Sequence, residues 1–272
     1  MFQIVDLLQS TEFISTEINL KFMKIRFLII LFSIFFIQLP AEAKKKRHSN
    51  HKRSYARSNR KHKTPHSTFV PIQVSTDGEI WGLDVSHHQQ NIDWETLGQH
   101  QPSFVFLKTT EGATKQDEKY VENYQGARNN NIPVGSYHFF TYKSSGKEQA
   151  LNFLSRVKFN KGDLPPVLDL EFSRRMPPVD QVKSELMDFI SIVSNKMACF
   201  PIVYCNYRYF NKYLHECLPE KCKLWIVDYK AKPDGNWTFW QTSDKHKVPG
   251  IKGYVDLNIY NGTKNNFAGL LN

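Results

Sequence analysis

Residues 166–171 read PVLDLE, a run that begins like a buried strand and ends on two carboxylates. Its apolar residues suit a sheet interior, where acidic side chains are almost never fully buried unless they are paired or hydrogen-bonded. Asp169 and Glu171 are two positions apart, so on a strand both point to one face, with Cα atoms about 6.6 Å apart at roughly 3.3 Å per residue. The stretch therefore predicts a strand that ends on a pair of neighbouring carboxylates.

Short apolar or β-branched runs like this one recur from Ile80 to the end of the chain, and the first five are each followed by a helix-like stretch. Strands that alternate with helices predict βαβ units and a parallel sheet. The expected strands are 80–86, 104–110, 132–140, 166–171, 201–206, 224–229, 237–243 and 254–261. The expected helices are 93–99, 115–129, 146–157, 179–196 and 207–216.

The last third of the chain has no room for helices between its strands. Only 7 residues separate Tyr229 from Trp237, and only 9 separate Ser243 from Gly253. A parallel crossover with its helix needs at least about 10 to 12 residues. The predicted fold is therefore α/β: an irregular TIM-like barrel with five βα units followed by three helix-poor strands that are joined by hairpins or irregular loops.

The net charge of +10 is concentrated in one segment of the 272-residue chain. Residues 44–63 contain ten Lys or Arg and no acidic residue, whereas residues 64–272 contain 23 basic and 22 acidic residues. The predicted barrel domain, 77–272, is thus nearly neutral, and nothing in it indicates a specific nucleic-acid partner. The basic segment, 44–76, has the composition of a disordered tail, either a solvated linker or a segment that contacts an anionic surface.

Residues 23–43 have the layout of a secretory signal peptide: two basic residues, an apolar run from Phe27 to Ile37, and then Ala41-Glu42-Ala43. We expect cleavage near Ala43 and export to the periplasm, cell wall or medium. An uncleaved membrane anchor is the alternative. Residues 1–22 lack this pattern within the 1–43 leader, so translation starts at either Met1 or Met23.

Four cysteines lie close together in the sequence, at Cys199, Cys205, Cys217 and Cys222. In an exported protein an even number favours disulfides, although the pairing cannot be deduced. Zinc is the alternative, but the spacing matches no common zinc site. We expect no metal and no cofactor.

Polar residues gather where the predicted strands end, and in such barrels active sites are built at the carboxyl ends of the strands. Two adjacent carboxylates that cannot both ionise freely raise one pKa, which provides a proton donor near neutral pH, and glycoside hydrolysis uses such pairs. Alternatively, Glu171 pairs with Arg174 or Arg175 on the surface. The polar residues are Asp84, Ser86, Thr109, Thr110, Glu111, Tyr137, His138, Asp169, Glu171, Tyr204, Asn206, Asp228, Gln241, Asp256 and Asn258.

From about Ile80 to Tyr260 the chain resembles the family 25 glycoside hydrolases, the muramidases or lysozymes of that family. The resemblance rests on blocks that occur in family order: GLDVSHHQ with NIDW, FVFLKTTEG, IPVGSYHFF, PVLDLE, PIVYCN, LWIVDY, FWQTS and VDLNIY. It implies a barrel with the five-plus-three organisation and hydrolysis of the β-1,4 bond between N-acetylmuramic acid and N-acetylglucosamine in bacterial peptidoglycan.

The resemblance also implies roles for individual residues. Glu171 matches the catalytic acid and Asp169 its companion carboxylate, which would steer the acetamido group of the substrate as that group attacks the anomeric carbon. The remaining matches are Asp84 and Asp256 as carboxylates that tune the acid, and Tyr137, Tyr204, Trp240 and Gln241 as substrate-binding residues. Asn206, at the end of the fifth strand, is also expected to bind substrate.

Two other functions fit the same residues. One is a cell-wall protein that binds glycan without cutting it, and the other is a chitin-type hydrolase of N-acetylhexosamine polymers. Whether the reaction retains or inverts the anomeric configuration stays open. No repeat or coiled-coil pattern requires an oligomer, so we expect a monomer.

Overall fold

The computed structural model describes residues 78–272. The predicted signal peptide and basic tail lie outside the described residues. Among residues 78–272, no helix has the length and apolar character needed to cross a membrane.

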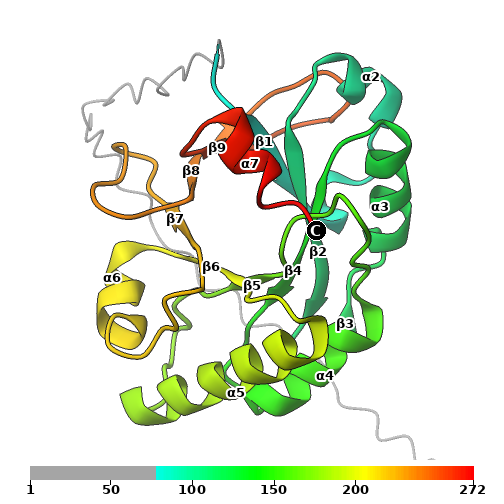
Figure 1. The fold of residues 1–272 in the computed structure, drawn as a ribbon. Helices are drawn as coiled ribbons and strands as arrows, with labels where there is room; N and C mark the ends of the chain where they lie inside the picture. Colours follow the sequence, from blue (N-terminus) through cyan, green and yellow to red (C-terminus); the bar gives the residue numbers. More distant parts are fainter. Residues whose placement is uncertain (1–77) are drawn as a thin grey trace, which may run out of the picture. The chain divides into compact units, whose positions relative to one another are not determined.

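Eight strands form a closed barrel in the order β1-β9-β8-β7-β6-β5-β4-β2, and β1 pairs with β2 to complete the ring (Figure 1). A ninth, two-residue strand, β3, pairs with the outer part of β2. The strands are β1 (Trp81–Val85), β2 (Phe104–Glu111), β3 (Lys115–Gln116), β4 (Val134–Phe139), β5 (Val167–Asp169), β6 (Ile202–Cys205), β7 (Leu224–Val227), β8 (Phe239–His246) and β9 (Val255–Tyr260).

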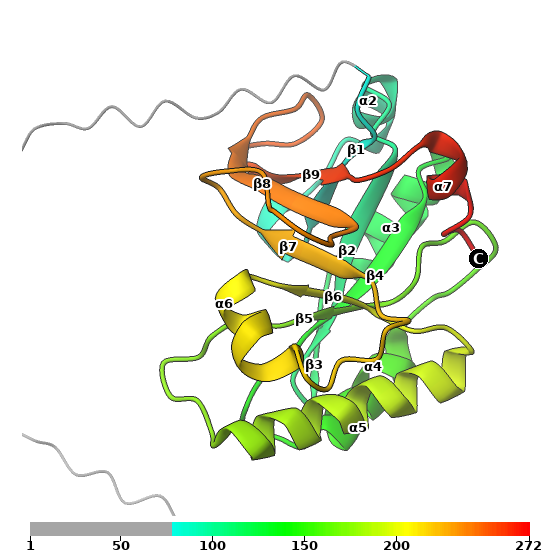
Figure 2. The ribbon, with the colours of Figure 1, turned by 60° about the vertical axis from the view of Figure 1, so that its left-hand side comes forward.

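The helices follow the first five barrel strands, β1, β2, β4, β5 and β6, except for α7, which follows β9. They are the 3-10 helix η1 (His87–Gln89), α2 (Trp94–Gln99), α3 (Tyr120–Asn129), α4 (Gly146–Arg156), α5 (Val179–Met197), α6 (Tyr207–Tyr209), the π-helical turn η2 (Phe210–Leu214) and α7 (Lys264–Ala268). Helices α4 and α5 lie side by side outside the barrel (Figures 1 and 2).

The architecture confirms the prediction of an irregular TIM-like barrel with helix-poor final strands. Strand β8 is parallel to β7 and is reached through an irregular loop, while β9 returns antiparallel to β8. The helix predicted from residue 115 begins only at Tyr120, because 115–116 pair with Thr110 and Glu111 as β3. The short helix α7, which Thr263 caps, was not predicted.

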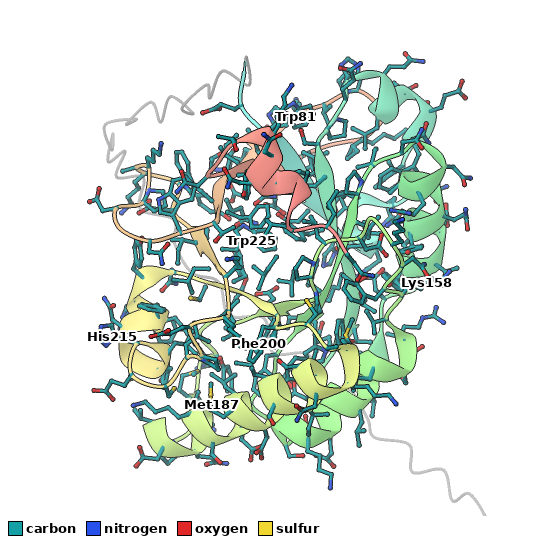
Figure 3. The ribbon with its side chains drawn as sticks, viewed as in Figure 1. Trp81, Lys158, Met187, Phe200, His215 and Trp225 are labelled. Atoms are coloured by element: carbon teal, nitrogen blue, oxygen red, sulfur yellow. The ribbon has the colours of Figure 1, made fainter. Side chains whose placement is uncertain are left out.

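Aromatic side chains fill the interior of the barrel. Trp225 stacks on Phe106 with ring centroids 4.3 Å apart, and Figure 3 shows Trp225 among the central strands. A Cβ atom at Gly82 would lie 2.5 Å from Phe104, and one at Gly135 would lie 2.3 Å from Phe106. These two positions are glycine because the rings occupy the space that a side chain would need.

Two further apolar layers hold the helices against the outside of the barrel. One joins strands β5 to β9 with α4, α5, α6 and η2, and in it Val182, Leu186, Phe189, Ile190 and Val193 of α5 are all buried. They recur at three and four positions, as the sequence predicts for one apolar stripe. The other layer joins β1 and β2 with α2 and α3. The barrel wall is therefore packed on both sides, which fixes where its strand ends lie.

The direction of β9 differs from that of the other barrel strands. It pairs antiparallel with both β1 and β8, and Asp256 lies directly opposite Asp84. The amino end of β9, rather than its carboxyl end, therefore meets the carboxyl end of β1.

The expected disulfides are not formed, since all four cysteines are free thiols. Cys205 is buried on β6, and burial raises its pKa to about 12. Burial also raises the pKa of Cys222 to about 12, with a further contribution from Cys199. At neutral pH these two side chains are protonated and behave as small apolar residues.

Candidate active site

A polar pocket of about 240 Å³ opens at the carboxyl ends of the parallel strands. This position is the one at which barrel enzymes of this kind carry their active sites. The pocket is lined by Asp84, Val85, Ser86, His88, Gln89, Lys108, Tyr137, Phe139, Asp169, Glu171, Tyr204, Trp225, Tyr229, Gln241 and Asp256.

The period of two along each strand explains which side chains reach the pocket. Alternate residues of a strand point to the same face of the sheet. Phe106 of β2 points into the barrel core, and Lys108, two positions later, points to the same side and reaches the pocket. On β5, Val167 lies inside the barrel below Asp169, which is followed by Glu171. Strands β2 and β5 thus each contribute an apolar base and a polar upper end.

Asp169 and Glu171 lie together in the pocket, as the sequence predicts. The Asp169 carboxylate has a buried oxygen, Oδ1, that no hydrogen-bond donor among the described residues reaches. Burial, followed by the negative charges of Glu171 and Asp84, raises the pKa of Asp169 well above its usual value. This oxygen is available to a donor from a bound ligand.

Glu171 is an exposed residue at the rim of the pocket, just beyond the end of β5. Partial withdrawal from water raises its pKa above the usual value for glutamate, and the charge of Lys108 opposes that shift. Within the described residues no ion pair joins Glu171 to Arg174 or Arg175. Glu171 is therefore placed to retain a proton and to reach a ligand from the solvent side.

Asp84 and Asp256 form a second carboxylate pair on the opposite wall. Asp84 Oδ2 accepts two amide hydrogen bonds, from Asn258 Nδ2 at 2.8 Å and from Gln241 Nε2 at 2.9 Å. Burial and the adjacent Asp84 raise the pKa of Asp256 to about 9. Burial also raises the pKa of Asp84, although hydrogen bonds from Asn258 and Gln241 oppose that shift.

A chain of hydrogen bonds connects this pair to the aromatic residues of the pocket. Tyr204 and Tyr229 both donate to Gln241 Oε1 at 2.8 Å, and Trp225 Nε1 donates to Asn258 Oδ1 at 2.9 Å. Both amides therefore have their oxygens occupied and present their NH₂ groups to Asp84. The network fixes the orientation of the carboxylate pair.

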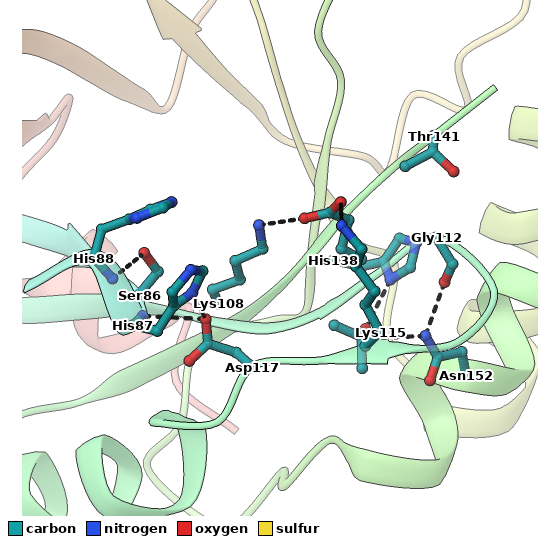
Figure 4. A network of polar contacts seen from close by, with 12 residues as sticks. Ser86, His87, His88, Lys108, Gly112, Lys115, Asp117, His138, Thr141 and Asn152 are labelled. Carbon is teal, nitrogen blue, oxygen red and sulfur yellow. Dashed lines mark hydrogen bonds and ion pairs between the residues drawn. The ribbon is translucent and has the colours of Figure 1, made fainter. Parts of the chain in front are cut away.

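Lys108 is the cation of the pocket. Its Nζ donates to Glu111 Oε2 at 2.8 Å (Figure 4). The same Nζ lies 4.9 Å from the centre of the Phe139 ring. Lys115 Nζ donates to the other oxygen of Glu111, also at 2.8 Å. Although burial opposes it, these two lysines lower the pKa of Glu111 to about 2. Glu111, unassigned from the sequence, therefore stays ionised and holds Lys108 in place.

Seven of the predicted site residues line the pocket, but Trp240 and Asn206 do not. Trp240 is buried in the outer apolar layer, with its indole NH donating to the backbone oxygen of Asp228. Asn206 caps α6, where its Oδ1 accepts from the backbone NH of Tyr209 at 2.9 Å. The structure gives both residues structural contacts outside the pocket, and their assignment to the substrate site stays a prediction.

The pocket also contains residues that the sequence analysis did not select. Lys108, Trp225 and Tyr229 belong to it, together with His88 and Gln89. The signal for the first two was available, because each lies an even number of positions from a buried interior residue of its strand. Tyr229 lies in the loop after β7, where no periodicity applies.

His138 is a core residue and not part of the site. It is fully buried, with Thr110 Oγ1 at 2.7 Å from Nδ1 and Gln149 Oε1 at 3.2 Å from Nε2. Burial lowers its pKa to about 4, so the ring is neutral. His87 contacts Asp117 at 2.7 Å, and this contact holds η1 against the residues after β3.

Asp256→Asn is expected to flatten the dependence of stability on pH. The folded-state pKa of Asp256, about 9, exceeds the usual 3.8, so the native state binds the extra proton and loses stability as pH rises between these values. Thermal unfolding from about pH 5 to about pH 9 should show a smaller decline for Asp256→Asn than for the wild type. Asp188→Asn, on the exposed face of α5, is the matched control. Parallel declines for the Asp256 variant and the wild type would contradict this account.

A closed α/β barrel with two carboxylate pairs in a polar mouth has the residues that glycoside hydrolysis uses, at the end of the barrel where such enzymes carry their sites. Residues 83–251 match the family described as Glycosyl hydrolases family 25. The chain belongs to this family, and it is a glycoside hydrolase.

Three comparisons give the extent of the similarity. The uncharacterized protein YegX of Escherichia coli O6:H1 is 32% identical over 209 residues, which cover 74% of this chain and 76% of the relative. Lysozyme M1 of Streptomyces globisporus is 30% identical over 210 residues, 71% of each chain. A family 25 glycosyl hydrolase from Bacillus anthracis superposes with a TM-score of 0.67 at 32% identity, covering 71% of this chain and 94% of that one.

Proposed function

We propose that the protein is a muramidase that hydrolyses the β-1,4 bond between N-acetylmuramic acid and N-acetylglucosamine in peptidoglycan. The observation that carries the proposal is the placement of Asp169 and Glu171 on one interior face of a family 25 barrel. The similarity to a protein named Lysozyme M1 supports the substrate class.

In the proposed reaction Glu171 donates its proton to the glycosidic oxygen as the bond to the anomeric carbon breaks. Its raised pKa keeps that proton available, which is the requirement for a general acid. The acetamido oxygen of the substrate then bonds to the anomeric carbon in place of a protein nucleophile. In the second step Glu171 takes a proton from the water that opens this intermediate, and the free enzyme is regenerated.

Asp169 is proposed to hold the acetamido group during this attack. An amide NH of the substrate would satisfy Oδ1, the buried oxygen that lacks a protein donor. As the acetamido group becomes positively charged, the Asp169 carboxylate would stabilise it electrostatically. Asp84 and Asp256, oriented by Gln241 and Asn258, form the opposite wall and are proposed to position the sugar.

The proposed substrate is part of the cell wall, which agrees with the predicted export of the protein. We infer that residues 23–43 direct secretion, with cleavage near Ala43, and that the basic tail contacts an anionic surface such as the cell wall. We expect the barrel to act as a monomer without a cofactor.

Digestion of purified peptidoglycan tests the proposed function. Mass spectrometry of the reduced products should find muramic acid at the new reducing ends. New ends on N-acetylglucosamine would reject the bond assignment, and cleavage of chitin alone would identify a chitin-type hydrolase. Binding without any cleavage would identify a non-catalytic glycan-binding protein.

A further inference from the structure

A second groove adjoins the pocket on the far side of Glu171. It encloses about 590 Å³, compared with about 240 Å³ for the pocket itself. Its lining comes from two segments, 139–143 after β4 and 171–175 after β5, together with Glu111. Phe139 and Glu171 line both spaces, so a ligand in the groove lies next to the proposed acid.

Three exposed cations line this groove, and we call them the cationic ledge: Lys143, Arg174 and Arg175. No carboxylate in the described part of the chain forms an ion pair with any of them. Glu111, which also lines the groove, is already neutralised by Lys108 and Lys115. The ledge therefore presents positive charge that the described residues leave uncompensated.

The segment that carries the two arginines is anchored to the barrel. Tyr142 Oη donates to the backbone oxygen of Glu171 at 2.9 Å and lies 2.6 Å from Tyr209 Oη. Phe172 packs edge-to-face on Tyr209 with ring centroids 5.3 Å apart, and the Arg208 guanidinium lies 5.1 Å from the Phe172 ring. These contacts hold the start of the segment beside the pocket, which keeps the following arginines at the groove.

We propose that the cationic ledge binds the carboxylates of the stem peptide of peptidoglycan, so that the enzyme favours peptide-bearing strands over bare glycan. The inference rests on the proposed muramidase function. The stem peptide is attached to the lactyl group of muramic acid and carries free carboxylates. The stem peptide therefore extends from the sugar at a point close to the bond that is cut. The cationic ledge lies next to Glu171 and so is close to this point.

The groove matches this occupant in charge and in surface. Arg guanidinium groups pair with carboxylates through two parallel hydrogen bonds, which suits a planar carboxylate better than the hydroxyl groups of a sugar. The aromatic rings of Phe139, Phe140 and Phe172 add apolar surface for the methylene groups of a peptide. A bare glycan strand has no carboxylate beyond that of the lactyl group and would leave most of the ledge unused.

The test compares two soluble substrates: glycan strands with intact stem peptides, and the same strands after an amidase has removed the peptides. The double variant Arg174→Gln/Arg175→Gln should raise KM for peptide-bearing strands about fivefold to tenfold, the effect of losing two exposed ion pairs. Its kcat, and its KM for bare strands, should stay at the wild-type values. Arg174→Lys/Arg175→Lys keeps both charges and should restore most of the affinity.

Lys196→Gln/Lys252→Gln is the matched control, since it removes two exposed cations that do not line the groove. It should not change the preference between the substrates. Added salt should reduce the wild-type preference, because exposed charges are screened. Equal losses on both substrates, or no loss on either, would overturn the inference while the muramidase function stands.

Binding measurements separate this inference from the proposed function. Fluorescence anisotropy with labelled strands should show that the inactive variant Glu171→Gln binds peptide-bearing strands more tightly than bare strands. Adding Arg174→Gln/Arg175→Gln to this variant should abolish the difference between the two strands. If the wild type cleaves neither strand, the proposed function fails. If the two strands bind equally, the ledge has no role in peptide recognition.

Discussion

Glu171→Gln is expected to lower kcat on peptidoglycan by about a thousandfold and to leave the fold intact. Proton transfer by a positioned acid contributes roughly 10² to 10⁴ in rate, and Gln has no transferable proton at that position. KM should change little, because the amide keeps the size and the polarity of the side chain. Release of soluble muropeptides, followed by chromatography, measures the effect.

The fold of this variant should be preserved because Glu171 is exposed at the rim and its side chain forms no ion pair among the described residues. Its melting temperature near neutral pH should be no lower than that of the wild type, because the raised pKa of Glu171 means that its ionisation does not stabilise the fold. Glu220→Gln, at an exposed position outside the pocket, should keep full activity. Turnover by Glu171→Gln close to that of Glu220→Gln would remove Glu171 from the role of acid.

Asp169→Asn is expected to lower kcat by about a hundredfold and to raise stability. The charge that stabilises the developing acetamido cation would be lost, and single electrostatic contributions of this type cost roughly 10² to 10³ in kcat. The pKa of Asp169 is raised in the folded state, so its ionisation destabilises the protein progressively as pH rises above the usual aspartate value. A neutral amide removes this penalty.

Thermal unfolding near neutral pH should therefore show a higher melting temperature for Asp169→Asn, by about 3 °C for each kcal/mol gained. The gain should disappear near about pH 3, where the carboxyl is protonated in both the folded and the unfolded state. Active sites often exchange stability for function in this way. A variant that is less stable than the wild type at neutral pH would show that Asp169 has a structural role instead.

The eight barrel strands could be predicted because each is a short apolar run, and the βα spacing of the first five restricts the topology. Residues 115–119 were assigned to a helix because a two-residue strand is too short to have a pattern of its own. Its formation depends on pairing with Thr110 and Glu111, which is a tertiary contact. Helix α7 is five residues long and is signalled only by the Thr263 cap.

The carboxylates of the site were predictable because acidic residues in apolar strands are rare unless they are paired, hydrogen-bonded or part of a functional site. Trp240 was predicted together with Gln241, but adjacent residues of a strand point to opposite faces, and only Gln241 lines the pocket. Asn206 follows the last residue of β6, where the chain has already turned into a helix and alternation no longer applies. The network that orders Asp84 joins residues of five strands and has no local signal in the sequence.

The reversed direction of β9 also determines where the chain leaves the barrel. The amino end of β9 is at the mouth, so its carboxyl end and the following α7 lie at the opposite, closed end. There Phe267 of α7 packs with Phe104 from the start of β2, and the backbone oxygen of Asn272 accepts from Gly162. An enzyme immobilised through its carboxyl terminus would therefore present its open mouth to the solution, away from the support.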